Sequence, residues 1–190
     1  SPGFLLNLGR KEFAADTVNK LFSGGYQNRL MKRGYSKLDS IDQKSRKGFF
    51  PYYGYFDENT LKAMSLSGIS FLITDSVSDR SVPFLEIRNE KPLMIIPINN
   101  RDDKEIIGKL KLWQRNFQEY TYEEDIEKAI FEGGLYVMKM HTEYQLRPEY
   151  SDVIRMLITY IKERPIWLTN INQLFSWWTF RNNLEIRSEI

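Results

Sequence analysis

The sequence of 190 residues contains no cysteine, which excludes a disulfide framework, a thiol nucleophile and every thiolate metal site. It contains a single histidine, His141, so a zinc centre with two or more histidine ligands cannot be assembled from one chain. A relay of serine, histidine and aspartate is also disfavoured, because no Gly-x-Ser-x-Gly turn surrounds any serine. The residue patterns of cysteine, zinc and serine hydrolases are therefore absent from this sequence.

An excess of charge of one sign is also lacking, since 27 Lys and Arg against 25 Asp and Glu leave a net charge of +2. Without a strongly positive field, we expect no nucleic-acid partner. The longest apolar runs, such as 69–74 and 93–98, have strand length and fall far short of the roughly 20 residues of a membrane-spanning helix. We therefore expect no transmembrane segment, and the first residues do not have the pattern of a signal peptide.

Aromatic residues, by contrast, are abundant. The chain has 12 Phe, 11 Tyr and 4 Trp, which make up 14% of its residues. With 42% hydrophobic residues, it has the composition of a folded protein and the length of one domain. The rings either pack in the core or stack on sugar rings, and composition leaves both roles open.

Strand-like and helix-like segments alternate from Gly48 to Phe180. This alternation predicts an α/β fold with a largely parallel sheet, either open or closed into a barrel. Asp57 is the expected cap of one helix, Gly68 its expected end and Thr169 the expected cap of the last helix. The strands are predicted from Gly48 and over 69–74, 93–98, 135–140 and 166–168, and the helices after Asp57 and over 105–120, 122–131, 149–162 and 170–180.

The pattern divides the chain into three parts. Residues 1–47 form a poorly assigned N-terminal segment, with helical spacing over 12–22 ended by Gly24 and Gly25, and a basic stretch over 27–47. Residues 48–181 form the α/β domain. Residues 182–190 alternate between apolar and polar side chains, which indicates an edge strand or the start of a further β segment.

Four polar loops follow predicted strands. They cover 51–54, 75–80, 99–103 and 141–145. In parallel α/β folds such loops converge on one face, so candidate site residues are sought there. His141 is the strongest candidate, because an imidazole gives or takes a proton near neutral pH. Asp75 and Asp79 either orient His141 or form a loop ion pair with Arg80.

Three stretches resemble the polysaccharide deacetylases, the NodB-homology group of carbohydrate esterases. Residues 48–54 with 57–63 resemble the family's Arg-Pro-Pro-Tyr-Gly segment and the helix after it, although Phe50 stands in place of the arginine. Residues 141–149 resemble the late Leu-x-x-His motif and its extension, and residues 168–178 resemble the closing helix. Residues 75–83 are similar to the loop of the fourth motif, without its tryptophan. The resemblance covers about residues 48–181 and implies a distorted or incomplete (β/α) barrel.

The resemblance also implies roles for individual residues. His141 would be the general acid that protonates the leaving amine, and the backbone N–H of Tyr53 would help to bind the oxyanion. Asp79 and Arg80 would tune His141. For contact with the sugar we predict Phe50, Tyr52 and Trp113, together with Asn100 and Arg101 from the loop at 99–103.

The departures from the family concern its metal. The resemblance implies a divalent ion such as zinc, held by an early Asp-Asp pair and a His-x-x-x-His motif, but residues 1–47 contain neither. We therefore expect no cofactor to be held by this chain alone. Activation of water at neutral pH depends on such an ion.

Three hypotheses remain. The chain is the back part of a deacetylase whose metal-binding part lies upstream or on a partner segment that completes the barrel. Alternatively it is a pseudo-deacetylase that binds a glycan, or a metal-independent hydrolase that uses His141 with an aspartate. In the first two cases the expected partner is a polysaccharide or amino-sugar glycan. The resemblance places such a protein in the cell envelope or outside the cell.

Overall fold

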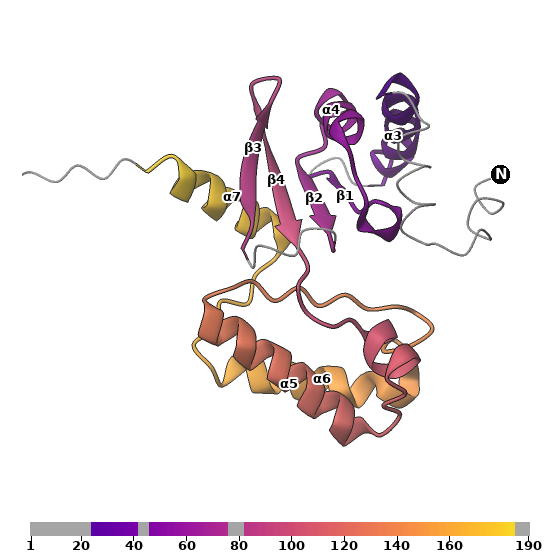
Figure 1. The fold of residues 1–190 in the computed structure, drawn as a ribbon, viewed down its shortest axis with the longest axis vertical. Helices are drawn as coiled ribbons and strands as arrows, with labels where there is room; N and C mark the ends of the chain where they lie inside the picture. Colours follow the sequence, from indigo (N-terminus) through magenta and orange to yellow (C-terminus); the bar gives the residue numbers. More distant parts are fainter. Residues whose placement is uncertain (1–23, 42–45, 76–81, 185–190) are drawn as a thin grey trace, which may run out of the picture. The chain divides into compact units, whose positions relative to one another are not determined.

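The computed structural model describes residues 24–41, 46–75 and 82–184 (Figure 1). The chain separates into two compact units. Unit 1 contains the described residues up to 75 together with 83–97 and 170–184, and unit 2 contains residue 82 and 98–169. The predicted helix over 12–22, the loop residues Asp79 and Arg80, and residues 185–190 of the predicted last segment lie outside the described residues.

Unit 1 is built on a sheet with the strand order β1-β2-β4-β3. Its strands are β1 (Gly48–Phe49), β2 (Phe71–Thr74), β3 (Phe84–Arg88) and β4 (Lys91–Pro97). The first three in this order are parallel, with Phe71 of β2 opposite both Gly48 and Met94. Parallel pairing confirms the predicted α/β class. The sheet described by these strands is open and is not closed into a barrel.

Strand β3 is absent from the sequence prediction. It pairs antiparallel to β4 through a hairpin whose two turn residues, Asn89 and Glu90, have φ of 47° and 61°. Two consecutive positive φ values match the right-handed twist of paired strands, and asparagine tolerates this conformation well. The sequence of β3 is short and contains the charged residues Glu86 and Arg88, so it lacks the apolar run by which β2 and β4 were predicted.

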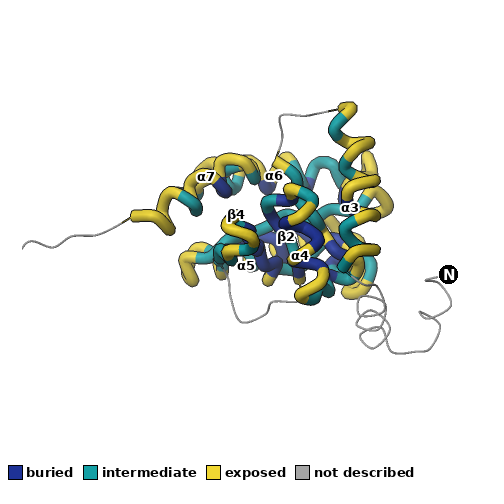
Figure 2. Tube along the Cα trace, turned by 90° about the horizontal axis from the view of Figure 1, so that it is seen from above, coloured by how far each residue is buried: buried dark blue, intermediate teal, exposed yellow. Residues whose placement is uncertain are grey.

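Helices α3 (Gly24–Leu38), α4 (Glu58–Leu66) and α7 (Ile171–Asn182) complete unit 1. Asp57 caps α4 as predicted, in a reciprocal pair with Thr60, and Gly68 has a φ of 71° just beyond its end. One prediction is wrong, because the side chain that caps α7 is Asn170, not Thr169. Gly24 lies in α3, and the helix that it was predicted to end lies outside the described residues. In Figure 2 the most buried trace runs through β2 and β4, whose side chains form the core with α4.

Unit 2 is mainly helical. It contains the π-helical turn η2 (Lys104–Lys109), α5 (Arg115–Glu132), the short η3 (Pro148–Tyr150) and α6 (Ser151–Lys162). The predicted helices over 105–120 and 122–131 are wrong as two elements, since α5 continues through Thr121 and ends at Gly133, whose φ is 62°. The predicted strands over 135–140 and 166–168 form no ladder with the described residues. No helix of the described part is long and apolar enough to cross a membrane.

Candidate functional site

The centre of the candidate site in unit 2 is the pair formed by His141 and Asp103. Nδ1 of His141 lies 2.5 Å from Oδ1 of Asp103, whose side chain has no exposed surface, whereas the histidine side chain is 26% exposed. An ionised carboxylate only accepts hydrogen bonds, so the network assigns the proton to Nδ1. Nε2 has no partner among the described residues. It is therefore the ring atom that can give or take a proton when a histidine acts as acid or base.

Local structure explains why this carboxylate points at His141. Asp103 is the residue before η2, but its side chain makes no cap bond to that helix. Instead, Oδ2 accepts the backbone N–H groups of His141 at 2.6 Å and of Gln145 at 3.1 Å. Three donors from 141–145 thus converge on one buried carboxylate, and they compensate for its removal from water.

A buried polar chain extends from this pair into the core of unit 2. The Tyr122 hydroxyl donates to Oε1 of Gln145 at 3.2 Å, and Nε2 of Gln145 donates to the Tyr150 carbonyl at 2.8 Å. Burial raises the pKa of Tyr122, and the nearby charge of Asp103 raises it further. The phenol therefore stays neutral and supports the loop that holds His141.

Arg101 anchors the loop that carries Asp103. Its guanidinium is bonded to Asp125 at 2.7 Å and to Glu124 at 2.5 Å, and it also donates to the Thr121 carbonyl at 3.2 Å. The Arg101 backbone N–H donates to the same Asp125 at 2.9 Å. These bonds tie Arg101 to α5. Its predicted role as a substrate ligand stays a prediction.

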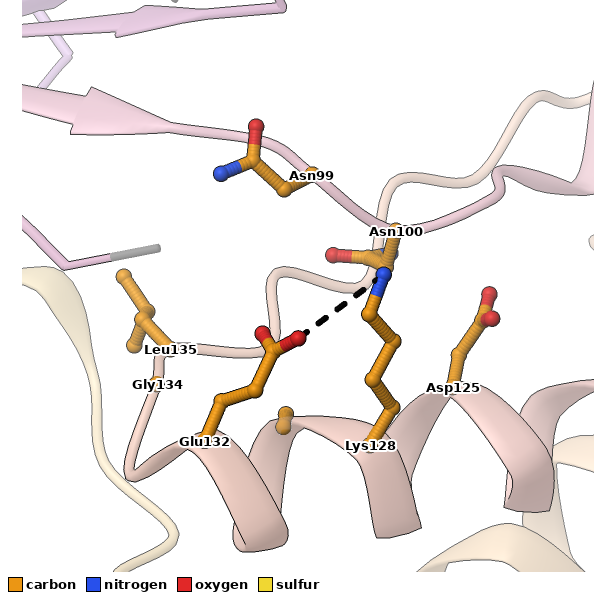
Figure 3. Close-up of a pocket in the computed structure, with 8 residues that line it drawn as sticks. Asn99, Asn100, Asp125, Lys128, Glu132, Gly134 and Leu135 are labelled. Atoms are coloured by element: carbon orange, nitrogen blue, oxygen red, sulfur yellow. Dashed lines mark ion pairs between the residues drawn. The ribbon is translucent and has the colours of Figure 1, made fainter. Parts of the chain in front are cut away.

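Asn100 and Asp102 contact the segment that leads to His141. The Asn100 amide bonds both backbone groups of Val137, and Asp102 pairs with Lys139 at 3.0 Å. Asn100 also borders a small pocket that is open to solvent (Figure 3). Figure 3 shows Lys128 directed towards Glu132, 4.0 Å away, across this pocket. The remaining lining residues are Asn99, Asp125, Ala129, Gly134 and Leu135.

In unit 1 the predicted loop at 51–54 meets the end of β2. Tyr53 and Gly54 have φ of 56° and 71°, and the Thr74 hydroxyl donates to the Gly54 carbonyl at 2.6 Å. A Cβ on Gly54 would lie 1.7 Å from Oδ1 of Asp75. The absence of a side chain at Gly54 therefore lets the turn approach Asp75 closely.

The other predicted aromatic contacts are surface residues. Tyr52 is 63% exposed, with its ring 4.3 Å from that of Tyr53, and a hydrogen bond with Tyr53 raises its pKa. Phe50 is exposed in the same loop, and Trp113 is exposed in unit 2, where Lys111 Nζ lies 5.7 Å from its ring centroid. Their predicted contact with sugar stays a prediction.

Sequence reasoning missed the residue that contacts His141. It named Asp75 and Asp79 as candidates, whereas the carboxylate in contact is Asp103. The available signal was the position of Asp103 in a polar loop directly after a buried strand. Gln145 and Asp125 carried no comparable signal, because a buried amide and a helix carboxylate are found throughout proteins.

Comparison with known proteins was made on sequence and on structure. No protein-family model matches the sequence, and no curated protein matches it. Among solved structures, a protein named as a polysaccharide deacetylase from Mycobacterium smegmatis matches with a TM-score of 0.73 and 14% identity over 90% of this chain and 64% of the other. The chain has a polysaccharide deacetylase-like fold. This confirms the resemblance drawn from the sequence.

Two further structures share this polysaccharide deacetylase-like fold. The Puue allantoinase matches with a TM-score of 0.69 and 17% identity, over 83% of this chain and 54% of its own. A protein named as a polysaccharide deacetylase from Pseudomonas aeruginosa PAO1 matches with a TM-score of 0.64 and 16% identity, over 78% and 51%. The chain thus spans about half to two thirds of the length of the structures it matches.

The described residues of this deacetylase-like domain do not by themselves fit the metal that the sequence resemblance implies. They contain no group of three or more His, Asp and Glu side chains that could hold an ion. Zinc sites use at least three such protein ligands, and Nδ1 of His141 is already bonded to Asp103. We therefore derive no catalytic step through a metal.

Proposed function

We propose that the chain is a polysaccharide deacetylase-like domain that acts on or binds an N-acetylated cell-surface glycan. The observation that supports this most strongly is the buried Asp103 carboxylate bonded to the partly exposed His141. The polysaccharide deacetylase-like fold is the second support. In this proposal the glycan lies at the envelope or outside the cell.

Removal of an acetyl group breaks a C–N bond, and the departing amine nitrogen must receive one proton. Protonated His141 donates that proton from Nε2, while Asp103 holds Nδ1–H and stabilises the positive ring before transfer. Activation of the attacking water needs a metal centre formed by residues other than those described here. Under this proposal, hydrolysis therefore depends on an upstream or partner segment.

A glycan-binding domain without catalysis is the alternative. It is favoured by the exposed aromatic side chains Phe50 and Tyr52 on one loop of unit 1, where Phe50 stands in place of the family's arginine. Aromatic faces stack on sugar rings without any catalytic group. Such a domain would keep affinity for the glycan and release no acetate.

The test uses the whole chain with oligomers of N-acetylglucosamine. Acetate release is measured with and without added zinc, and affinity is measured by calorimetry. Release that disappears in His141→Gln supports the enzyme and contradicts its dependence on a further segment. Binding that is weakened by Tyr52→Ala, without release, supports the binder. Tyr120→Ala is the control, since Tyr120 is also an exposed tyrosine, 67% against 63%. A chain that shows no acetate release and no glycan binding would contradict the proposal.

A further inference from the structure

The segment that leads to His141 has no strand partner among the described residues, although its sequence is strand-like. Backbone groups outside a ladder still need hydrogen-bond partners. At Val137 both are satisfied by one side chain: Asn100 donates from Nδ2 to the Val137 carbonyl at 3.0 Å and accepts the Val137 N–H at 3.1 Å through Oδ1. The side-chain amide thus replaces the two-way exchange of a β-bridge.

This contact is the first of three that recur at every second residue. Val137 contacts Asn100, Lys139 pairs with Asp102 at 3.0 Å, and His141 is bonded to Asp103 through both its backbone and its ring. The loop at 99–103 therefore holds the segment at three successive points. The third of these points is at His141, the proposed proton donor.

The loop at 99–103 is itself held in place by hydrogen bonds. Arg101 is bonded to Asp125 through both its backbone and its guanidinium, and Oδ1 of Asp102 accepts the Glu105 N–H at 2.8 Å. Asn100 therefore lies between a fixed loop and a segment with no other regular pairing. Loss of its amide would loosen the segment without removing either partner of the Asp103–His141 pair.

The bonds of Asn100 go mainly to the protein itself, and its predicted contact with substrate stays a prediction. Its amide donates to the carbonyls of Val137 and Arg101 and accepts from Val137. An asparagine amide has two donors and two acceptor lone pairs, so one lone pair remains for a ligand.

We propose that Asn100 is a positioning residue, which holds the 137–141 segment so that the His141 ring stays on Asp103. Its effect on catalysis rests on the proposed function, whereas its effect on the ring does not. Small displacements of a proton donor lower a reaction rate strongly, so loosening this segment would reduce turnover more than substrate affinity.

The test compares Asn100→Ala with Asn99→Ala, a neighbouring exposed asparagine of the same loop, since both backbone groups of Val137 bond to Asn100. Because His141 is the only histidine, its ring gives one set of NMR signals. Amide hydrogen exchange at Val137 and exchange of the His141 Nδ1 proton should both become about tenfold faster in Asn100→Ala, given the net value of the lost bonds. In Asn99→Ala both rates should equal those of the unmodified chain.

Exchange in Asn100→Ala that equals that of Asn99→Ala overturns the positioning role. If Asn100→Ala does not fold, the isosteric Asn100→Asp replaces it, because Asp keeps the acceptor and loses the donors. Because this acceptor still bonds the Val137 N–H, the measurement is then the exchange of the His141 Nδ1 proton. Faster exchange of that proton supports the role and unchanged exchange overturns it. Where the unmodified chain releases acetate, Asn100→Ala should lower kcat and leave KM unchanged. Altered exchange in a chain that neither releases acetate nor binds the glycan contradicts only the proposed function.

Discussion

Asp103 and His141 form a close polar contact, with 2.5 Å between Oδ1 and Nδ1, and the aspartate side chain has no exposed surface. The carboxylate also accepts the N–H groups of His141 and Gln145. It therefore serves structure and chemistry together, because it orders residues 141–145 and sets the proton position on the ring.

The stability of unit 2 should depend on Asp103 more than on its neighbour Asp102. Asp103→Ala leaves two backbone N–H groups without their acceptor in a buried place, which should lower the free energy of unfolding by about 3 kcal/mol. Asp102→Ala removes a more exposed carboxylate that bonds the Glu105 N–H, and should cost about 1 kcal/mol. Urea unfolding measures both, and equal losses would contradict the structural role of Asp103.

The turn at Gly54 should tolerate no side chain. Gly54 and Gly68 both have a φ of 71° in unit 1, but a Cβ at Gly54 meets Asp75 at 1.7 Å and one at Gly68 meets nothing within 4 Å. Gly68→Ala should lower the free energy of unfolding by about 1 kcal/mol through backbone strain alone. Gly54→Ala should cost at least about twice as much, because Asp75 must also move. Equal Tm values for the two variants would refute the close approach.

Two glutamates on α5 should respond to pH with opposite signs. Hydrogen bonds from Tyr160 and Arg164 hold the pKa of Glu127 below its ordinary 4.5, whereas burial and the charge of Glu123 raise that of Glu119. A carboxyl with a lowered pKa contributes stability above pH 4.5, and this stability is lost as the pH falls through the pKa of the folded state. A carboxyl with a raised pKa contributes stability below pH 4.5, and this stability is lost as the pH rises through the pKa of the folded state.

At pH 7, therefore, Glu127→Gln should be less stable than the unmodified chain and Glu119→Gln more stable. The difference for Glu119 should disappear as the pH falls below 4.5, and the difference for Glu127 only once the pH is also below its lowered pKa, so that the carboxyl is protonated in both the folded and the unfolded chain. Thermal unfolding between pH 3 and 7 checks this, with the two variants as controls for one another. Differences that are constant with pH would show that charge is not their cause.

Sequence reasoning predicted the parallel strands and the end signals of several elements. The apolar runs of β2 and β4 are unmistakable because both faces of these strands are covered, and the caps at Asp57 and the glycine at 68 follow local chemistry. The prediction failed where tertiary contacts decide. Residues 135–140 have a strand-like pattern, but side chains from the loop at 99–103 replace the ladder.

The site was predictable in part. His141 and the loop at 99–103 are visible in sequence because each follows an apolar run, yet the choice of Asp103 among several loop carboxylates depends on which one lies in the core. Burial of that kind is a property of the assembled unit. Asn100 shows the same limit, since the sequence cannot distinguish an amide that binds sugar from one that binds Val137.

We infer that Asp103 fixes the proton of neutral His141 on Nδ1 and leaves Nε2 as the atom that exchanges protons. Long-range ¹H–¹⁵N NMR of the single imidazole measures this directly, in the unmodified chain and in Asp103→Asn. We expect a protonated Nδ1 and an unprotonated Nε2 in the unmodified chain, with this tautomer lost or reversed in the variant. A predominant Nε2–H tautomer in the unmodified chain would contradict it.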